Sequence, residues 1–147
     1  MKTFVHRGGC HCGAIGLTLR TRRAPEQQVI GACQCGFCRS HNARTYSDPT
    51  AACTLEAREP DHLQLYAFGL NTARVVLCRR CGTYVAMLLR EGAAAWTTVS
   101  VDALDERARF TRSPEPRDFG GEDAAGRLVR RKARWIPTDL VGWPDEA

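Results

Sequence analysis

The stretch Cys33-Gln34-Cys35-Gly36-Phe37-Cys38 places three cysteines within six residues. Two cysteine pairs flank it in the chain, Cys10-His11-Cys12-Gly13 upstream and Cys78-Arg79-Arg80-Cys81-Gly82 downstream. Seven of the eight cysteines therefore lie in tight clusters, and only Cys53 stands alone. Thiolates two or three residues apart converge on one point, as a tetrahedral zinc site with sulfur ligands requires. The pattern predicts that metal binding organises the fold.

The two flanking pairs together supply four sulfur ligands. In an extended strand, residues i and i+2 point to the same side, so Cys10 and Cys12 can present two sulfurs together. Cys78 and Cys81, followed by Gly82, are typical of a knuckle in which backbone N–H groups bond to thiolates and glycine permits a positive φ. We predict that these four cysteines hold a closed, structural zinc that contributes directly to the folding free energy. An iron site is the alternative, and colour would reveal it.

The triplet supplies only three sulfurs to a second metal. A zinc with three protein ligands and an open position is typical of catalysis rather than of structure. We therefore predict a catalytic zinc at Cys33, Cys35 and Cys38, with water or a substrate thiol as the fourth ligand. Zinc stabilises the deprotonated form of a bound thiol, as carbon–sulfur bond chemistry on a thiol adduct requires. The alternative is a second closed site with a fourth protein ligand, from Cys53, His41 or His11.

Outside the cysteine clusters, apolar residues alternate along several short segments. Ile15, Leu17 and Leu19 alternate with small or polar residues, which is typical of a half-buried strand. The β-branched run 97–101 also favours a strand. Further strands are expected at residues 28–32, 62–68, 74–77 and 83–89, whereas residues 39–60 show no clear period and are expected to be mostly loop. The sequence predicts a mainly β fold.

The C-terminal part of the chain differs in composition and charge. Prolines and glycines interrupt it from residue 114 onward, so we expect no long element there. Arg107–Arg134 carries nine basic residues against four acidic ones, and this surplus of five equals the net charge of the whole chain, +5. We predict one domain at residues 1–106 and an irregular basic extension at residues 107–147 packed on it. Such a charge surplus can attract an anionic substrate or a nucleic acid.

Length and composition are ordinary for a globular protein. A chain of 147 residues can bury a real core. No apolar run approaches the roughly 18–20 residues that a transmembrane helix needs, and the first residues lack the apolar segment of a signal peptide. Clustered cysteines without an export signal favour reduced thiols and metal over disulfides. We therefore expect a cytoplasmic protein with no membrane partner.

Three motifs together resemble the glutathione-dependent formaldehyde-activating enzyme family, which includes the centromere protein V group. They are Gly9-Cys10-His11-Cys12-Gly13-Ala14, Cys33-Gln34-Cys35-Gly36-Phe37-Cys38-Arg39 and Cys78-Arg79-Arg80-Cys81-Gly82, within a resemblance that spans roughly residues 7–104. The resemblance implies a β-tent fold of antiparallel sheets braced by a zinc. It implies the same division into a four-cysteine structural site and a three-cysteine catalytic site. The implied activity joins formaldehyde to glutathione as S-hydroxymethylglutathione, or performs a related step on another thiol.

Two functions from different classes follow from these observations. The first is a zinc-dependent carbon–sulfur lyase that acts on the adduct of a small thiol such as glutathione. The second is a non-catalytic, zinc-stabilised binding module that contacts nucleic acid or protein through Arg107–Arg134. Steep salt dependence of nucleic-acid binding would identify the second. We favour the lyase, because aromatic residues are few and do not alternate with the basic ones.

Overall fold

The structure is a computed structural model, and it describes residues 2–145. Within that range eleven strands form one curled sheet, which confirms the predicted mainly β fold. The strands are β1 Phe4–Gly9, β2 Ile15–Thr21, β3 Gly31–Cys33, β4 Thr45–Tyr46, β5 Ala52–Ala57, β6 Leu63–Tyr66, β7 Arg74–Cys78, β8 Tyr84–Glu91, β9 Ala94–Ser100, β10 Glu115–Arg117 and β11 Ile136–Val141. The α-helices are α1 Gly36–Ser40 and α2 Ala124–Arg134. Neither of these, nor any other helix in the described range, has the length and apolar character that a membrane span needs.

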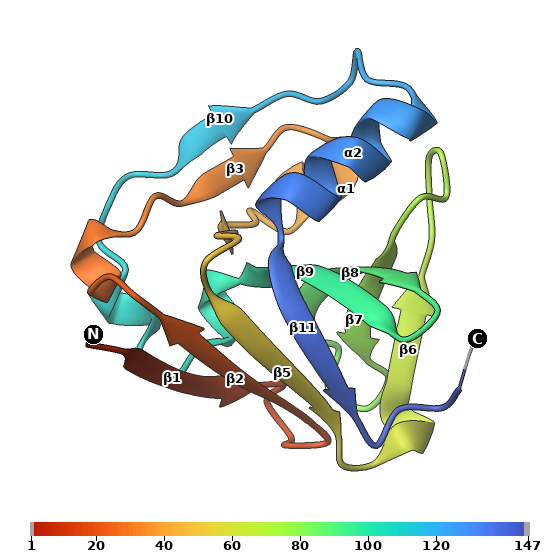
Figure 1. Cartoon of the computed structure of the whole chain (residues 1–147). Coiled ribbons are helices and arrows are strands. Elements are labelled where there is room, and N and C mark those ends of the chain that lie inside the picture. Colours follow the sequence, from red (N-terminus) through yellow and green to blue (C-terminus); the bar gives the residue numbers. More distant parts are fainter. Residues whose placement is uncertain (1, 146–147) are drawn as a thin grey trace.

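Strand β9 joins the parts of the sheet, because it pairs with three other strands. It pairs with β8 along most of its length, with β11 in its middle and with β4 near its end. From these neighbours the sheet continues through β5 and β2 to β1, through β7 to β6, and through β3 to β10. Most pairs are antiparallel, as predicted, but β11 runs parallel to β5 and β10 runs parallel to β3. In Figure 1 both α-helices lie at the end of the molecule where β3 and β10 lie.

The core follows the alternation seen in the sequence. In β2, Ile15, Leu17 and Leu19 are buried in one large apolar cluster between the strands. A second, smaller cluster includes Cys38 of the triplet and Trp135, which follows α2 directly. The second cluster therefore packs the triplet and the end of α2 against the same face of the sheet.

The prediction of an irregular C-terminal extension is wrong for two of its segments. Helix α2 begins after Asp123, whose carboxylate accepts a hydrogen bond from the backbone N–H of Gly126 at 2.7 Å, a normal helix N-cap. Strand β11 lies inside the sheet, between β5 and β9. The prolines and glycines that led us to expect no long element lie outside α2 and β11 or, as with Pro137 and Gly126, are accommodated within them. The domain boundary at residue 106 stays a prediction.

The expectation of a loop at residues 39–60 is also wrong in part. Strand β5 lies there, and its residues Cys53, Leu55 and Ala57 alternate as the buried side of the strand. Alanine and cysteine are weak strand signals, so the short run did not stand out. Strand β5 is held by backbone hydrogen bonds to β2 on one side and β11 on the other. The strand propensity of its residues does not record this pairing.

Candidate functional site

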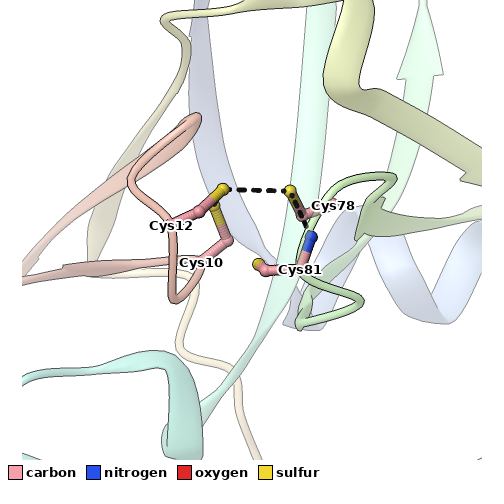
Figure 2. Close-up of side chains that lie close together, drawn as sticks. All are labelled: Cys10, Cys12, Cys78 and Cys81. Atoms are coloured by element: carbon pink, nitrogen blue, oxygen red, sulfur yellow. Dashed lines mark hydrogen bonds between the residues drawn. The ribbon is translucent and has the colours of Figure 1, made fainter.

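Four cysteines from two distant parts of the chain converge on one point, as predicted. The sulfur atoms of Cys10, Cys12, Cys78 and Cys81 all lie within 4.8 Å of one another. The distance is 3.7 Å from Cys10 Sγ to Cys12 Sγ and 3.6 Å from Cys12 Sγ to Cys78 Sγ (Figure 2). A tetrahedral zinc with Zn–S bonds of about 2.3 Å separates its sulfur ligands by about 3.8 Å. All eight cysteines are free, so the donor atoms and their spacing fit a metal ion.

The local backbone explains how this cluster forms. Cys10 and Cys12 lie in the β1–β2 loop, while Cys78 ends β7 and Cys81 lies in the turn to β8. The N–H of Cys81 donates to Cys78 Sγ at 3.5 Å, which confirms the predicted knuckle geometry. Gly82 has a φ of +79°, the positive value expected of it. The cluster therefore ties the first hairpin of the sheet to its middle, some 66 residues further along the chain.

Burial and hydrogen bonding shift the pKa values of two of these thiols in opposite directions. Burial raises the pKa of Cys10 to about 12. Burial also acts to raise the pKa of Cys81, but hydrogen bonds with Thr83 and neighbouring groups bring it down to about 5. Four thiolates this close repel one another strongly unless a cation lies between them. The cluster has the chemistry of a metal site rather than of a set of inert thiols.

The triplet forms a second cluster from a single stretch of chain. Cys33 ends β3, Cys35 is the N-cap of α1 and Cys38 is buried within α1. Their three sulfur atoms lie within 4.8 Å of one another, and the N–H of Cys38 donates to Cys35 Sγ at 3.4 Å. A hydrogen bond between them lowers the pKa of Cys33 to about 5 and raises the pKa of Cys38. Sharing of a proton in this way indicates a site that a dication would complete.

The structure brings none of the three proposed fourth ligands into the triplet. His11 and His41 are exposed, and the ring of His41 contacts that of Phe37 at 4.4 Å. Cys53 is buried in β5 within the large apolar cluster. In the part of the chain that the structure describes, no histidine, cysteine or carboxylate joins the three sulfur atoms.

A large cavity opens beside the triplet and not beside the four-cysteine cluster. Its volume is about 1160 Å³, and Cys33 and Cys38 form part of its wall. Other parts of the wall are lined by strand β4, by Tyr84 and Met87 of β8, and by α2. Ligand pockets in proteins commonly measure about 300–1,000 Å³, so a small peptide or thiol fits. A smaller cavity of about 250 Å³ is lined by neither cysteine cluster.

Tyr84 is a candidate functional residue that the sequence did not reveal. Its hydroxyl is buried and has no hydrogen-bond partner among the described residues, although it lines the cavity. Burial, followed by the charges of Cys38, Cys33 and Cys35, raises its pKa, so the hydroxyl stays protonated. A buried hydroxyl without a partner is costly and often marks a place that a ligand completes. The sequence offered one signal for it. Tyr84 carries a hydroxyl although it lies in an otherwise apolar strand, two residues after Gly82.

Comparison with known proteins agrees with this geometry. The sequence profile described as glutathione-dependent formaldehyde-activating enzyme matches residues 5–118, more than half of the chain. The fold is also similar to the crystal structure of a protein from Rhodobacter sphaeroides, with a TM-score of 0.51 and 29% sequence identity. That similarity covers 67% of this chain and 87% of the other. Both cysteine clusters lie within the matched residues, whereas α2 lies beyond them.

Proposed function

The chain belongs to the glutathione-dependent formaldehyde-activating enzyme family, and on that premise we propose that it is a zinc-dependent carbon–sulfur lyase. Its substrate is the adduct of a small thiol, glutathione with formaldehyde or a related pair. The observation that carries the proposal is the position of the triplet: its three cysteine sulfurs converge, and two of these cysteines, Cys33 and Cys38, line a cavity of about 1160 Å³. A site that only stabilised the fold would have no need of such a cavity.

In this proposal each cysteine cluster holds a zinc ion, and the two ions have different roles. Cys10, Cys12, Cys78 and Cys81 hold a structural zinc, and Cys33, Cys35 and Cys38 hold the catalytic one. A zinc ion bound by the triplet would keep a substrate thiol deprotonated at neutral pH. The three cysteines fix the point in the cavity at which that sulfur is held, because they come from one short strand-to-helix turn.

The proposed reaction makes one bond and moves one proton. The thiol gives up its proton and its sulfur attacks the carbonyl carbon of formaldehyde. A C–S bond forms, the carbonyl π electrons pass to the oxygen, and the oxygen accepts the proton that the thiol lost. The reverse reaction breaks the same C–S bond and returns the proton. Tyr84 is suited to donate a hydrogen bond to that oxygen, since its hydroxyl is protonated, buried and without a partner among residues 2–145.

The binding-module alternative receives less support from the basic residues. Many of them already have partners: Arg109 pairs with Glu26 and Glu106, Arg130 with Glu122, and Lys132 with Glu91. A surface that binds nucleic acid needs cations that are free to contact phosphates. The basic segment instead contributes α2 to the cavity wall, which favours an anionic small molecule over a nucleic acid.

We also propose a cytoplasmic location, because metal binding by the seven free thiols of the two clusters needs a reducing compartment. Its test is exchange NMR on mixtures of ¹³C-formaldehyde and glutathione. We expect the zinc-loaded protein to speed the interconversion of the free thiol and S-hydroxymethylglutathione above the spontaneous rate. Cys35→Ser should abolish the increase. A wild-type protein with two bound zincs that accelerates the exchange of no thiol tested would overturn the proposal.

A further inference from the structure

Helix α2 forms one side of the cavity but lies outside the residues that match the family. The match ends at residue 118, and α2 spans Ala124–Arg134. The helix is held in place at its end, where Trp135 packs in the same buried cluster as Cys38 and Tyr84. Its cavity-lining residues are Ala125, Gly126, Val129, Arg130, Arg131, Ala133 and Arg134. The shape and charge of this wall therefore belong to this chain and are not given by the family match.

The cavity is strongly positive. Five arginines line it against two carboxylates, Asp48 and Glu122. Glu122 is already paired, since its carboxylate accepts from Arg130 Nε at 2.9 Å. An excess of guanidinium groups in a partly enclosed space attracts anions and strengthens their binding once they are inside. The arginines are Arg23, Arg117, Arg130, Arg131 and Arg134.

Arg131 differs from the other arginines of this wall because it is buried and lacks an acidic partner within the described range. Only 6% of it is exposed, and no carboxylate of residues 2–145 lies within 4.0 Å of its guanidinium nitrogens. Its Nη1 donates to Thr72 Oγ1 at 2.5 Å, and its guanidinium lies 5.0 Å from the centre of the Trp135 ring. Its Nε is buried and has no hydrogen-bond partner in the described chain. A buried charge is normally paired, so this group has donors to spare for a ligand.

Arg131 remains a cation under ordinary conditions. Burial, and then the charges of Arg130 and Arg127, lower its pKa to about 10. Thr72 and Trp135 fix its orientation, so little conformational freedom is lost when a ligand binds. A planar guanidinium with free N–H groups matches the two oxygens of a carboxylate better than an ammonium group does.

We propose that Arg131 binds a carboxylate of the thiol substrate and makes the enzyme selective for thiols that carry one. This inference rests on the proposed function, because it assigns the opposite end of a ligand whose sulfur the triplet would hold. Arg131 acts as a specificity-determining residue supplied by α2. A neutral thiol of the same length would leave the guanidinium buried without an anionic partner, and a site that hydrogen-bonds one group strongly rejects an analogue without it.

The test compares 3-mercaptopropionate with 3-mercaptopropionamide, which differ only in the carboxylate. Calorimetric titration of the zinc-loaded wild-type protein should show that the carboxylate binds at least about 30-fold more tightly. Arg131→Gln should remove most of that preference, because it should weaken the binding of 3-mercaptopropionate and leave the binding of 3-mercaptopropionamide unchanged. Lys132→Gln is the matched control, because Lys132 neighbours Arg131 on α2, pairs with Glu91 and does not line the cavity. It should leave both affinities unchanged.

Three outcomes would overturn the inference. The wild type could bind both thiols equally, Arg131→Gln could weaken both to the same extent, or it could leave the preference intact. Equal weakening would mean that Arg131 acts on the triplet or on the fold. If Arg131→Gln does not fold, the comparison of the two thiols on the wild type still decides the carboxylate preference. Arg131→Lys keeps the positive charge but loses the planar guanidinium with its paired N–H donors, so it should reduce that preference.

The same thiols separate this inference from the proposed function. Binding preference without any acceleration of formaldehyde exchange would contradict the lyase and leave the role of Arg131 standing. Acceleration that does not distinguish the carboxylate from the amide would support the lyase and contradict the role of Arg131.

Discussion

The two cysteine clusters offer the same donor atom to a metal but differ in how the chain builds them. The four-cysteine cluster joins the β1–β2 loop to the β7–β8 turn, so it closes a long loop of chain. The triplet comes from six consecutive residues, so a metal bound there would close only a very short loop of chain. One cluster lies away from the cavity and the other forms part of its wall.

This difference separates stability from reactivity. A metal that links distant segments stabilises the fold, because binding it requires the native arrangement of both. A metal held by one short turn adds little to the fold, but its open position is available to a ligand. We therefore expect substitutions in the first cluster to affect stability and substitutions in the second to affect chemistry.

The largest effect should come from the four-cysteine cluster. Cys78→Ser removes one ligand from the site that ties the two parts of the sheet together, and we expect a loss of more than about 4 kcal/mol in the free energy of unfolding. Urea unfolding followed by circular dichroism measures it. A variant that keeps wild-type stability would show that the cluster is not a structural metal site.

A matched substitution in the triplet should give the opposite pattern. Cys35→Ser changes one partly exposed sulfur to oxygen, and we expect a stability change below about 1 kcal/mol. Turnover should fall by more than the roughly 10- to 100-fold that loss of a hydrogen bond to a metal ligand costs. Exchange NMR and urea unfolding on the same sample test both halves. A loss in the free energy of unfolding as large as that of Cys78→Ser would show that the two clusters do not differ in this way.

Tyr84 lies beside the triplet, and its substitution tests whether activity can fall without a loss of stability. Tyr84→Phe removes a buried hydroxyl without a partner in the described chain, so the thermal midpoint should stay equal or rise by a few degrees. Turnover should fall by about 10- to 100-fold, because a hydrogen bond to the reacting oxygen is lost. Falls in both properties would indicate a structural role for the hydroxyl instead.

Cys53 provides a control, since it is a buried thiol that belongs to neither cluster. Burial raises its pKa to about 12, while the unfolded chain ionises it near the ordinary thiol value. The unfolded state thus binds fewer protons than the native state above about pH 9, and this thiol's contribution to stability falls as pH rises there, by about 1.4 kcal/mol per pH unit. Cys53→Ala should lower stability by about 1–2 kcal/mol at pH 7.5 and by less at pH 10.

Urea unfolding of both proteins at the two pH values measures this difference. A stability loss that does not change with pH would mean that the Cys53 thiol is not held protonated by the fold. Zinc content should equal that of the wild type at pH 7.5, in contrast to both cluster variants.

The sequence predicted the two cysteine clusters better than it predicted the helices and strands around them. Sulfur ligands two or three residues apart converge through local geometry alone, so both clusters and the positive φ of Gly82 could be read from spacing. Strand β2 could be read as well, because its alternation of Ile15, Leu17 and Leu19 is local.

Helix α2 could not be predicted in this way, because its stability is tertiary. Leu128 and Val129 are its only apolar residues larger than alanine, and Val129 is 71% exposed. Its inward contacts are made by Leu128, by Arg131 and by Trp135, which lies just beyond its end. The positions of Tyr84 and Arg131 at the cavity likewise depend on how β8 and α2 pack together, and no spacing along the chain records that.

In our proposal the four-cysteine cluster is a closed metal site and the triplet is an open one. Native mass spectrometry during a titration with a chelator tests it most directly, with glutathione added in a second series. We predict two zincs per chain, of which one leaves at low chelator concentration, is perturbed by glutathione and is absent from Cys35→Ser, while the other is lost only with the fold. Two zincs that leave together and ignore glutathione, or a single zinc that Cys35→Ser does not remove, would contradict the account.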